Sequence, residues 1–182
     1  MTKHIRKYLF LALLSLPLIA LDQYTKWLVR QNLAIGEFWT PWSWLEPYAR
    51  IVHWHNTGVA FGMFQNAAVF ITILSSLVAL AIIYYFPRIP NDDWILRISL
   101  GLQFTGAVGN LIDRFSIGYV TDFISLGTFP VFNVADSCIT IGTIILILGV
   151  IVYEQREKTR RRDQSHSEPS TTDHRSEHFD IR

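Results

Sequence analysis

The apolar residues of this 182-residue chain lie in four blocks that polar stretches separate. A helix rises about 1.5 Å per residue, so roughly 20 mostly apolar residues cross the ~30 Å hydrocarbon core of a bilayer. Residues 67–86 have this length without a charge, residues 134–153 have it with one charge, and residues 94–112 come close to it. These three blocks predict transmembrane helices, and we expect Arg97 near one end of the third to snorkel to the interface.

The first block is shorter and permits two interpretations. Residues 9–21 supply 13 apolar positions behind a basic start, which is also the pattern of a cleaved secretory signal. The alternative is an uncleaved helix over about residues 8–27, with Asp22 inside its far end and Lys26 snorkelling outward. The uncleaved helix predicts four transmembrane helices with both termini on one side of the membrane.

The distribution of basic residues predicts the orientation, because Lys and Arg near the ends of membrane spans are retained in the cytoplasm. Ten such residues lie on the side of the termini and four on the other side. Both termini are therefore predicted to be cytoplasmic. The two longer connections, about residues 30–66 and 113–133, are predicted to face outward.

The first outer connection is rich in aromatic residues, and Trp42 and Trp44 are typical of the headgroup region of a membrane. We expect this connection to lie on the membrane surface. Near its end, Val52 and Trp54 alternate with two histidines, a weak strand signal. Glycine and proline interrupt the second outer connection.

Composition narrows the class further. The chain is 50% hydrophobic and 17% charged, with a net charge of +1 and one cysteine, which excludes a disordered protein and a disulfide scaffold. This balance also argues against a nucleic-acid binder. Seven acidic and seven basic residues over 154–182 predict a disordered cytoplasmic tail. The predicted fold is an all-α integral membrane protein: residues 1–153 form a domain of four transmembrane helices with a small extracytoplasmic β-containing segment.

Polar residues converge near the predicted outer face. An unpaired carboxylate is costly in a membrane span, so each aspartate near one is a functional candidate. The expected layer contains Asp22, Asp113, Asp122, Asp136, Asn56, Asn110, Asn133 and Arg114.

Each position also has a simpler explanation. Asn133 could cap the last helix, with Asp136 near the free N–H groups of its first turn. Asp113 could pair with the neighbouring Arg114, Asp122 could be a solvated loop acid, and Asp22 could pair with Lys26 one turn away.

Two carboxylates held close together would share one proton, because both cannot easily ionise in a poorly hydrated site. The ionised member could then take a proton from water while the protonated member polarises a peptide carbonyl, as in an aspartic protease. Other chemistry has weaker support: Cys138 is isolated, and His53 and His55 lack a further ligand cluster. We therefore expect no metal site.

Two rival functions remain open at this stage. A small proton-coupled transporter or channel subunit also uses intramembrane carboxylates, but it would more naturally place them near the midplane between repeated halves. We find no internal repeat in the chain. A purely structural four-helix protein is the third possibility.

Four sequence blocks resemble the signature blocks of one family, the lipoprotein signal peptidases or signal peptidase II. They are DQYTK from Asp22, HNTGVAFG from His55, GNLIDRFSIGYVTDF from Gly109 and FNVADSCITIG from Phe132. The resemblance covers about residues 8–153 and leaves the tail without a counterpart.

This resemblance implies a bacterial inner-membrane aspartic endopeptidase that cleaves diacylglyceryl-modified prolipoproteins just before the lipidated cysteine. By motif position, Asp122 and Asp136 would be catalytic. The residues expected to bind substrate or support the site are Asp22, Asn56, Asn110, Asp113, Arg114 and Asn133. It implies a lipid-modified prolipoprotein substrate and contact with membrane lipid, with no metal or organic cofactor, no nucleic acid and no obligate protein partner.

Overall fold

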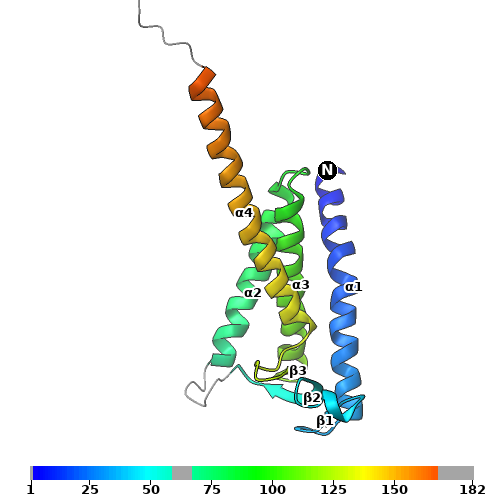
Figure 1. Cartoon of the computed structure of the whole chain (residues 1–182). Helices are drawn as coiled ribbons and strands as arrows, with labels where there is room; N and C mark the ends of the chain where they lie inside the picture. Colours follow the sequence, from blue (N-terminus) through cyan, green and yellow to red (C-terminus); the bar gives the residue numbers. More distant parts are fainter. Residues whose placement is uncertain (1, 59–66, 168–182) are drawn as a thin grey trace, which may run out of the picture. The chain divides into compact units, whose positions relative to one another are not determined.

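The computed structural model describes residues 2–58 and 67–167 of the chain. Within these ranges the fold is mostly helical, with one small antiparallel sheet (Figure 1). The elements are α1 (Thr2–Asn32), β1 (Phe38–Trp39), η1 (Ser43–Leu45), β2 (Ala49–Asn56), α2 (Ala67–Tyr85), η2 (Phe86–Arg88), α3 (Trp94–Ser116), β3 (Val120–Leu126) and α4 (Val134–Ser167).

Four segments in the described part of the chain are long and apolar enough to cross a membrane. They are His4–Asn32, Ala68–Arg88, Trp94–Ser116 and Val134–Thr159. The predicted fold class, four transmembrane helices with a small β-containing segment, is confirmed.

The chain divides into two compact units, residues 1–147 and residues 148–182. Helix α4 continues beyond the predicted span end at residue 153 to Ser167, so residues 154–167 are helical where the composition predicted disorder. Glu, Gln, Lys and Arg dominate this stretch and are good helix formers, and no Gly or Pro interrupts them. The prediction for residues 168–182 lies outside the described residues.

Helix α3 is the central helix of the first unit. In the most apolar 18-residue stretch of α3, 50% of the residues are buried inside the protein, whereas the share is 17% for the corresponding stretches of α2 and α4. Small residues let neighbouring backbones approach it closely. A Cβ at Gly106 would collide with the carbonyl oxygen of Ala135, and one at Gly109 would lie 2.8 Å from Asp22 Oδ2. These contacts require glycine where α3 meets the start of α4 and the polar part of α1.

Gly106→Ala is therefore expected to destabilise the protein by roughly 1–3 kcal/mol, because backbone must move to accept the methyl group. The same shift would displace the first turn of α4. The melting temperature in detergent measures the effect. Ser116→Ala, at the exposed end of α3, is the matched control and should leave the melting temperature unchanged.

Arg97 does not snorkel to the interface as expected. Its side chain is buried, with the guanidinium carbon 4.3 Å from the centroid of the Phe10 ring. Its Nη1 also donates to the carbonyl oxygen of Asn91 at 3.3 Å. The aromatic faces and this carbonyl provide the electrostatic partners that the sequence pattern could not identify.

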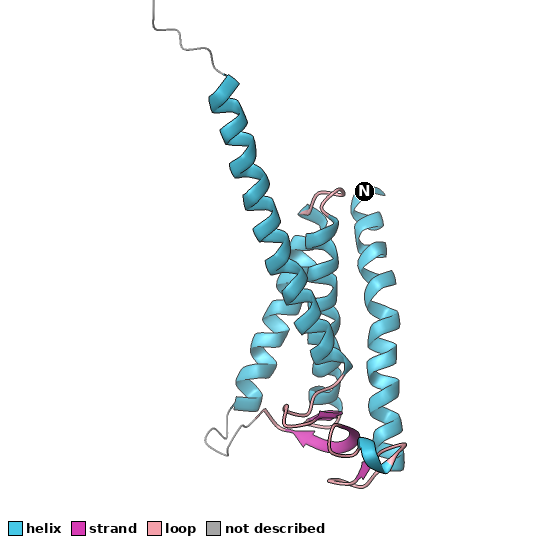
Figure 2. Ribbon diagram, viewed as in Figure 1, coloured by secondary structure: helices cyan, strands magenta, loops and turns pink. Residues whose placement is uncertain are grey.

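The sheet lies at the end of the bundle opposite the N-terminus of α1 (Figure 2), in the strand order β1-β2-β3. The strand predicted near the end of the first outer connection is confirmed as β2, but the prediction that its residues alternate regularly between buried and exposed is wrong. Ile51 pairs with Ile124 and Trp54 pairs with Asp122, so two residues of β2 face one of β3 in a bulge. Val52 and His53 are consequently both buried, whereas Trp54 is exposed.

Strand β3 was not predicted. The sequence indicated only that glycine and proline interrupt this connection. Gly118 and Gly127 lie just before and just after the strand. Their φ values of 84° and 51° are in the left-handed region that favours glycine. Residues 120–123 are all buried, so β3 lacks the alternation that identifies a half-buried strand. This strand carries Asp122 into the interior.

Candidate active site

Asp122 lies on β3 with only 1% of its surface exposed. Its Oδ1 accepts a hydrogen bond from Asn133 Nδ2 at 2.7 Å, and its Oδ2 accepts one from Asn56 Nδ2 at 2.8 Å. Both carboxyl oxygens are therefore held by amide groups from other elements. Asp122 is not the solvated loop acid that the simpler explanation supposed.

Asp136 lies in the first turn of α4 and is only partly buried. Asn110 Nδ2 donates to its Oδ1 at 2.8 Å. The side-chain oxygen of Asn133 accepts from the Asp136 N–H at 2.9 Å, and Asp136 Oδ2 accepts from the Asn133 N–H at 3.2 Å. Asn133 thus forms the helix cap that its position suggested, through a reciprocal pair of hydrogen bonds.

Asn133 joins the two carboxylates. Its side-chain oxygen and backbone N–H bind Asp136, while its Nδ2 donates to Asp122 and also, at 3.1 Å, to Asn110 Oδ1. This pattern fixes which way each amide faces: nitrogens point at the carboxylates, and the oxygen of Asn110 points away from Asp136. The structure thereby gathers Asp122 and Asp136 around one asparagine, although 14 positions separate them in the sequence.

The pKa of Asp122 is raised to about 6. Burial is the main cause and the negative charge of Asp136 adds to it, while the hydrogen bonds from Asn56 and Asn133 oppose the shift. A carboxyl group with this pKa can hold a proton near neutral pH. Asp136 is close enough for its charge to affect the protonation of Asp122.

A buried lysine supports this layer. Lys26 is fully buried, and its Nζ lies 2.9 Å from Asp22 Oδ2, 3.2 Å from Asp113 Oδ2 and 3.0 Å from Asn110 Oδ1. The expected outward snorkelling of Lys26 is therefore wrong, because two carboxylates and an amide oxygen in the interior compensate its charge. The suggested pairing of Asp22 with Lys26 is present.

Asp113 does not pair with Arg114. Instead its Oδ2 also accepts a hydrogen bond from the Thr121 N–H at 3.0 Å, and its Oδ1 lies 3.5 Å from Arg30 Nη1. Arg30 Nη1 donates in turn to Thr121 Oγ1 at 3.0 Å. Helices α1 and α3 thus hold β3 at the residue immediately before Asp122.

Asp22 fixes the start of α4, which carries Asp136. Its Oδ1 accepts the Ala135 N–H at 2.9 Å, one of the free N–H groups in the first turn of α4. This bond ties α1 to α4 one residue before Asp136. Asp22 and Asp113 therefore act on the positions of Asp136 and Asp122 respectively.

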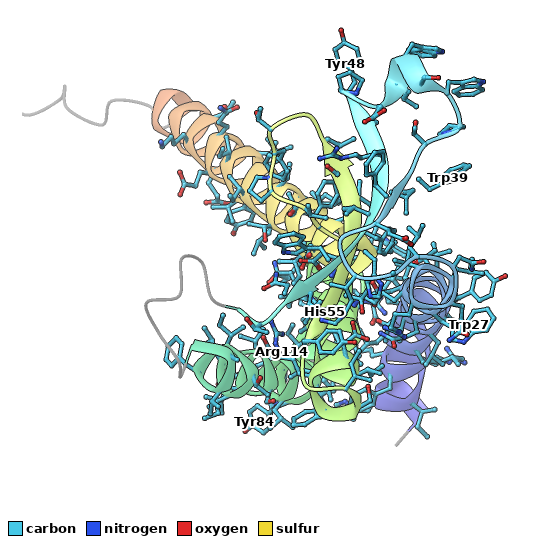
Figure 3. The ribbon with its side chains drawn as sticks, turned by 90° about the horizontal axis from the view of Figure 1, so that it is seen from below. Trp27, Trp39, Tyr48, His55, Tyr84 and Arg114 are labelled. Atoms are coloured by element: carbon cyan, nitrogen blue, oxygen red, sulfur yellow. The ribbon has the colours of Figure 1, made fainter. Side chains whose placement is uncertain are left out.

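Arg114 lies apart from this hydrogen-bond network. It is partly buried at the end of α3 and lines a pocket of about 260 Å³. The other lining residues are Asn56, Thr57, Ala68, Val69, Thr72, Ile73, Phe115, Gly118 and Tyr119. Because Asn56 also binds Asp122, the pocket adjoins Asp122. Figure 3 shows the labelled side chain of Arg114 from the sheet end.

The two histidines of β2 have other roles. His53 Nδ1 contacts the carbonyl oxygen of Leu33 at 2.8 Å, and the His55 ring stacks on Tyr119 with centroids 3.7 Å apart. Among the described residues, no group of three His, Cys, Asp or Glu side chains could hold a metal ion.

Sequence reasoning missed Arg30 and Thr121 as members of the site and named Lys26 only as a possible partner of Asp22 or a residue that snorkels outward. The spacing of Lys26 was a signal for more, because a lysine one helical turn after an aspartate inside an apolar segment is a candidate buried ion pair. Thr121 was hidden by its place on the unpredicted strand. Arg30 has a partner 83 positions away at Asp113, which no local pattern identifies.

The fold is shared with membrane enzymes of known structure. Two solved structures, each described as a bacterial membrane enzyme, superpose with TM-scores of 0.67 and 0.68 at 27% and 30% sequence identity. They cover 90% and 77% of this chain, which covers 94% and 91% of theirs. The class defined by the fold is therefore a multi-pass membrane enzyme.

Sequence comparison identifies the family. The family profile described as signal peptidase (SPase) II matches residues 14–152. The lipoprotein signal peptidase of Shouchella clausii is 36% identical over 151 residues, which are 82% of this chain and 98% of that protein. That of Dehalococcoides mccartyi is 43% identical over 138 residues, 74% of this chain and 84% of that protein. The chain belongs to the signal peptidase II family of aspartic peptidases, whose general function is to cleave signal peptides from prolipoproteins.

Proposed function

We propose that this protein is an aspartic endopeptidase of the bacterial inner membrane that cleaves diacylglyceryl-modified prolipoproteins just before the lipidated cysteine. Asp122 and Asp136 are the catalytic pair, and water is the nucleophile. The observation that carries this assignment is the pair of hydrogen bonds that one residue, Asn133, donates to the two carboxylates, from its Nδ2 to Asp122 and from its backbone N–H to Asp136.

The reaction uses one proton shared between the two acids. The ionised carboxylate removes a proton from water as the water oxygen bonds to the scissile carbonyl carbon, and the protonated carboxyl group donates its proton to the carbonyl oxygen. Collapse of the tetrahedral intermediate breaks the C–N bond. The leaving nitrogen receives a proton from the acid that took one from water. A hydroxyl group of the intermediate returns its proton to the other carboxylate as the new carbonyl forms, so the pair ends with one proton, as it began.

The other residues of the layer hold this pair in place. Asn56, Asn110 and Asn133 direct N–H groups at the carboxylates, and Asp22 and Asp113 fix the backbone beside them. Arg114, in the adjoining pocket, is assigned to substrate binding because it presents a cationic group beside the acid pair.

The predicted topology suits this substrate. With both termini cytoplasmic, the aspartates lie near the outer face, where a peptide anchored by a lipidated cysteine presents its scissile bond. In this arrangement residues 1–153 form the peptidase domain, and the aromatic connection over residues 30–58 covers the substrate at the membrane surface. The segment from residue 154 is a cytoplasmic tail, and the reaction requires neither a metal nor a protein partner.

Cleavage of purified precursors tests the function directly. In detergent, the protein should cut a diacylglyceryl-modified precursor immediately before the modified cysteine, as mass spectrometry of the products would show, and leave the unmodified precursor intact. Equal cleavage of both precursors would contradict the lipid requirement. The rival transporter function predicts ion flux in proteoliposomes without precursor cleavage.

The raised pKa of Asp122 predicts a pH-dependent stability. Because its folded pKa of about 6 exceeds the ordinary 3.8, the folded state binds a proton that the unfolded state releases. This stabilisation is fully present below about pH 3.8, is lost as the pH rises through about 6, and amounts to roughly 3 kcal/mol. The melting temperature of the wild type should therefore fall more from acidic to neutral pH than that of Asp122→Asn. The exposed-site variant Asp92→Asn should follow the wild type, and identical profiles for wild type and Asp122→Asn would contradict the prediction.

A further inference from the structure

A second pocket lies at the end of the bundle opposite the sheet. Its volume is about 350 Å³, and its lining residues are His4, Tyr8, Tyr84, Pro87 and Arg88. The N-terminus of α1 and the connection from α2 to α3 meet at this end (Figure 1). The family's reaction does not use this region, because the paired aspartates lie at the sheet end.

The pocket is positively charged and has no acidic lining residue. Arg88 forms no ion pair with a carboxylate in the described part of the chain. It is nevertheless held in place: its Nη1 donates to the carbonyl oxygen of Tyr84, and its guanidinium carbon lies 3.9 Å from the centroid of the Tyr84 ring. A guanidinium has five N–H donors, so most of them remain available to a ligand.

The rest of the pocket is also fixed. The hydroxyl of Tyr8 donates to the carbonyl oxygen of Ile83 at 3.1 Å and ties α1 to α2. Lys7 Nζ donates to the carbonyl oxygens of Pro87 and Ile89 at 2.9 Å and 2.5 Å, which ties α1 to η2 and adds a second positive charge. A preorganised cationic site pays less ordering entropy when it binds an anion.

The surroundings identify the kind of anion. Tyr8 and Tyr84 are 41% and 58% exposed at the ends of membrane spans, where tyrosine favours the headgroup level. The two helices that supply these tyrosines also expose apolar side chains, such as Leu9 of α1 at 55% and Leu80 of α2 at 62%. A phosphate headgroup with acyl chains matches this combination of a cationic pocket and helices with exposed apolar side chains.

We propose that this pocket binds the headgroup of an anionic phospholipid, with Arg88 as its principal phosphate ligand. Basic pockets between transmembrane helices are a recurrent means of holding such lipids. The first turn of α1 has no acidic residue, so its free N–H groups add favourable potential for the phosphate. The bound lipid bridges α1, α2 and η2 and stabilises this end of the bundle.

Lipid titration of the purified full-length protein in neutral detergent tests the proposal. Phosphatidylglycerol should bind, as measured by native mass spectrometry, and raise the melting temperature more than zwitterionic phosphatidylcholine does. Arg88→Gln should weaken phosphatidylglycerol binding by about tenfold, since it removes a charge-assisted hydrogen bond. Arg88→Lys, which retains the charge without the planar fork, should lie between the two.

The matched control is Arg6→Gln, which removes the same charge from an exposed position of α1 outside the pocket. It should bind phosphatidylglycerol as the wild type does. Equal weakening in Arg6→Gln and Arg88→Gln would overturn the proposal in favour of general surface charge. An equal melting-temperature increase from inorganic phosphate would overturn the lipid assignment. Prolipoprotein cleavage by Arg88→Gln should be retained, which shows that the variant folds and separates this test from that of the catalytic pair.

Discussion

Asp122→Asn and Asp136→Asn are each expected to lower the rate of precursor cleavage by at least about 10³-fold. Either change removes one of the two groups that must exchange protons with water and with the peptide carbonyl, and such groups contribute roughly 10²–10⁴-fold. Because the two acids act as a unit, the double variant should be hardly slower than either single one. The measurement is the initial cleavage rate of a lipid-modified precursor in detergent.

The matched control for these variants is Asp92→Asn, an exposed carboxylate in the turn between η2 and α3. It should cleave at the wild-type rate. Elution volume and melting temperature must show that the two single variants and the double variant remain folded, because the carboxylates of Asp122 and Asp136 accept hydrogen bonds that an amide cannot fully replace. A folded Asp122→Asn or Asp136→Asn protein with near-normal turnover would remove that residue from the catalytic pair.

The second large effect is expected from Lys26→Met. This change removes the cation that lies within 3.2 Å of both Asp22 and Asp113 and leaves two carboxylates buried without it. Breaking a buried ion pair by removing one partner costs about 3–5 kcal/mol. Activity should fall as well, since Lys26 donates to the oxygen of Asn110, whose nitrogen donates to Asp136.

Thermal unfolding in detergent and cleavage rate measure these two effects. Lys158→Met, at an exposed position of α4, is the matched control and should change neither. The double variant Asp22→Asn with Lys26→Met should recover part of the lost stability, because it neutralises one of the unpaired carboxylates. A Lys26→Met protein as stable as the wild type would show that this network does not stabilise the fold.

Much of the architecture follows from local sequence properties. Length and hydropathy predicted the four membrane-spanning helices, because a bilayer requires long apolar segments whose backbone hydrogen bonds close internally. Strand β2 was also detectable from its alternation, even though the bulge before Trp54 breaks the pattern. Strand β3 was not, because its buried residues 120–123 provide no alternation.

The sequence could also predict part of the candidate site, namely its residues but not their contacts. The rarity of carboxylates in membrane segments was enough to single out the four aspartates, and the sequence blocks were enough to suggest the family, which the comparisons confirm. Neither could show which polar groups contact one another. Asp113 lies beside Arg114 in the sequence, yet its partners are Lys26 and Arg30 on another helix.

The sequence by itself determined the class of protein, the number of spans and the residue types available for acid chemistry, because these depend on composition and short-range periodicity. Only the tertiary structure decided that Lys26 is buried, that Asn133 contacts both Asp122 and Asp136, and that Asp22 binds the N–H group of Ala135. The physical reason is that a buried charge or amide takes its partner from whichever element packs against it. That choice is made by the folded bundle, across separations such as the 113 positions between Asp22 and Ala135.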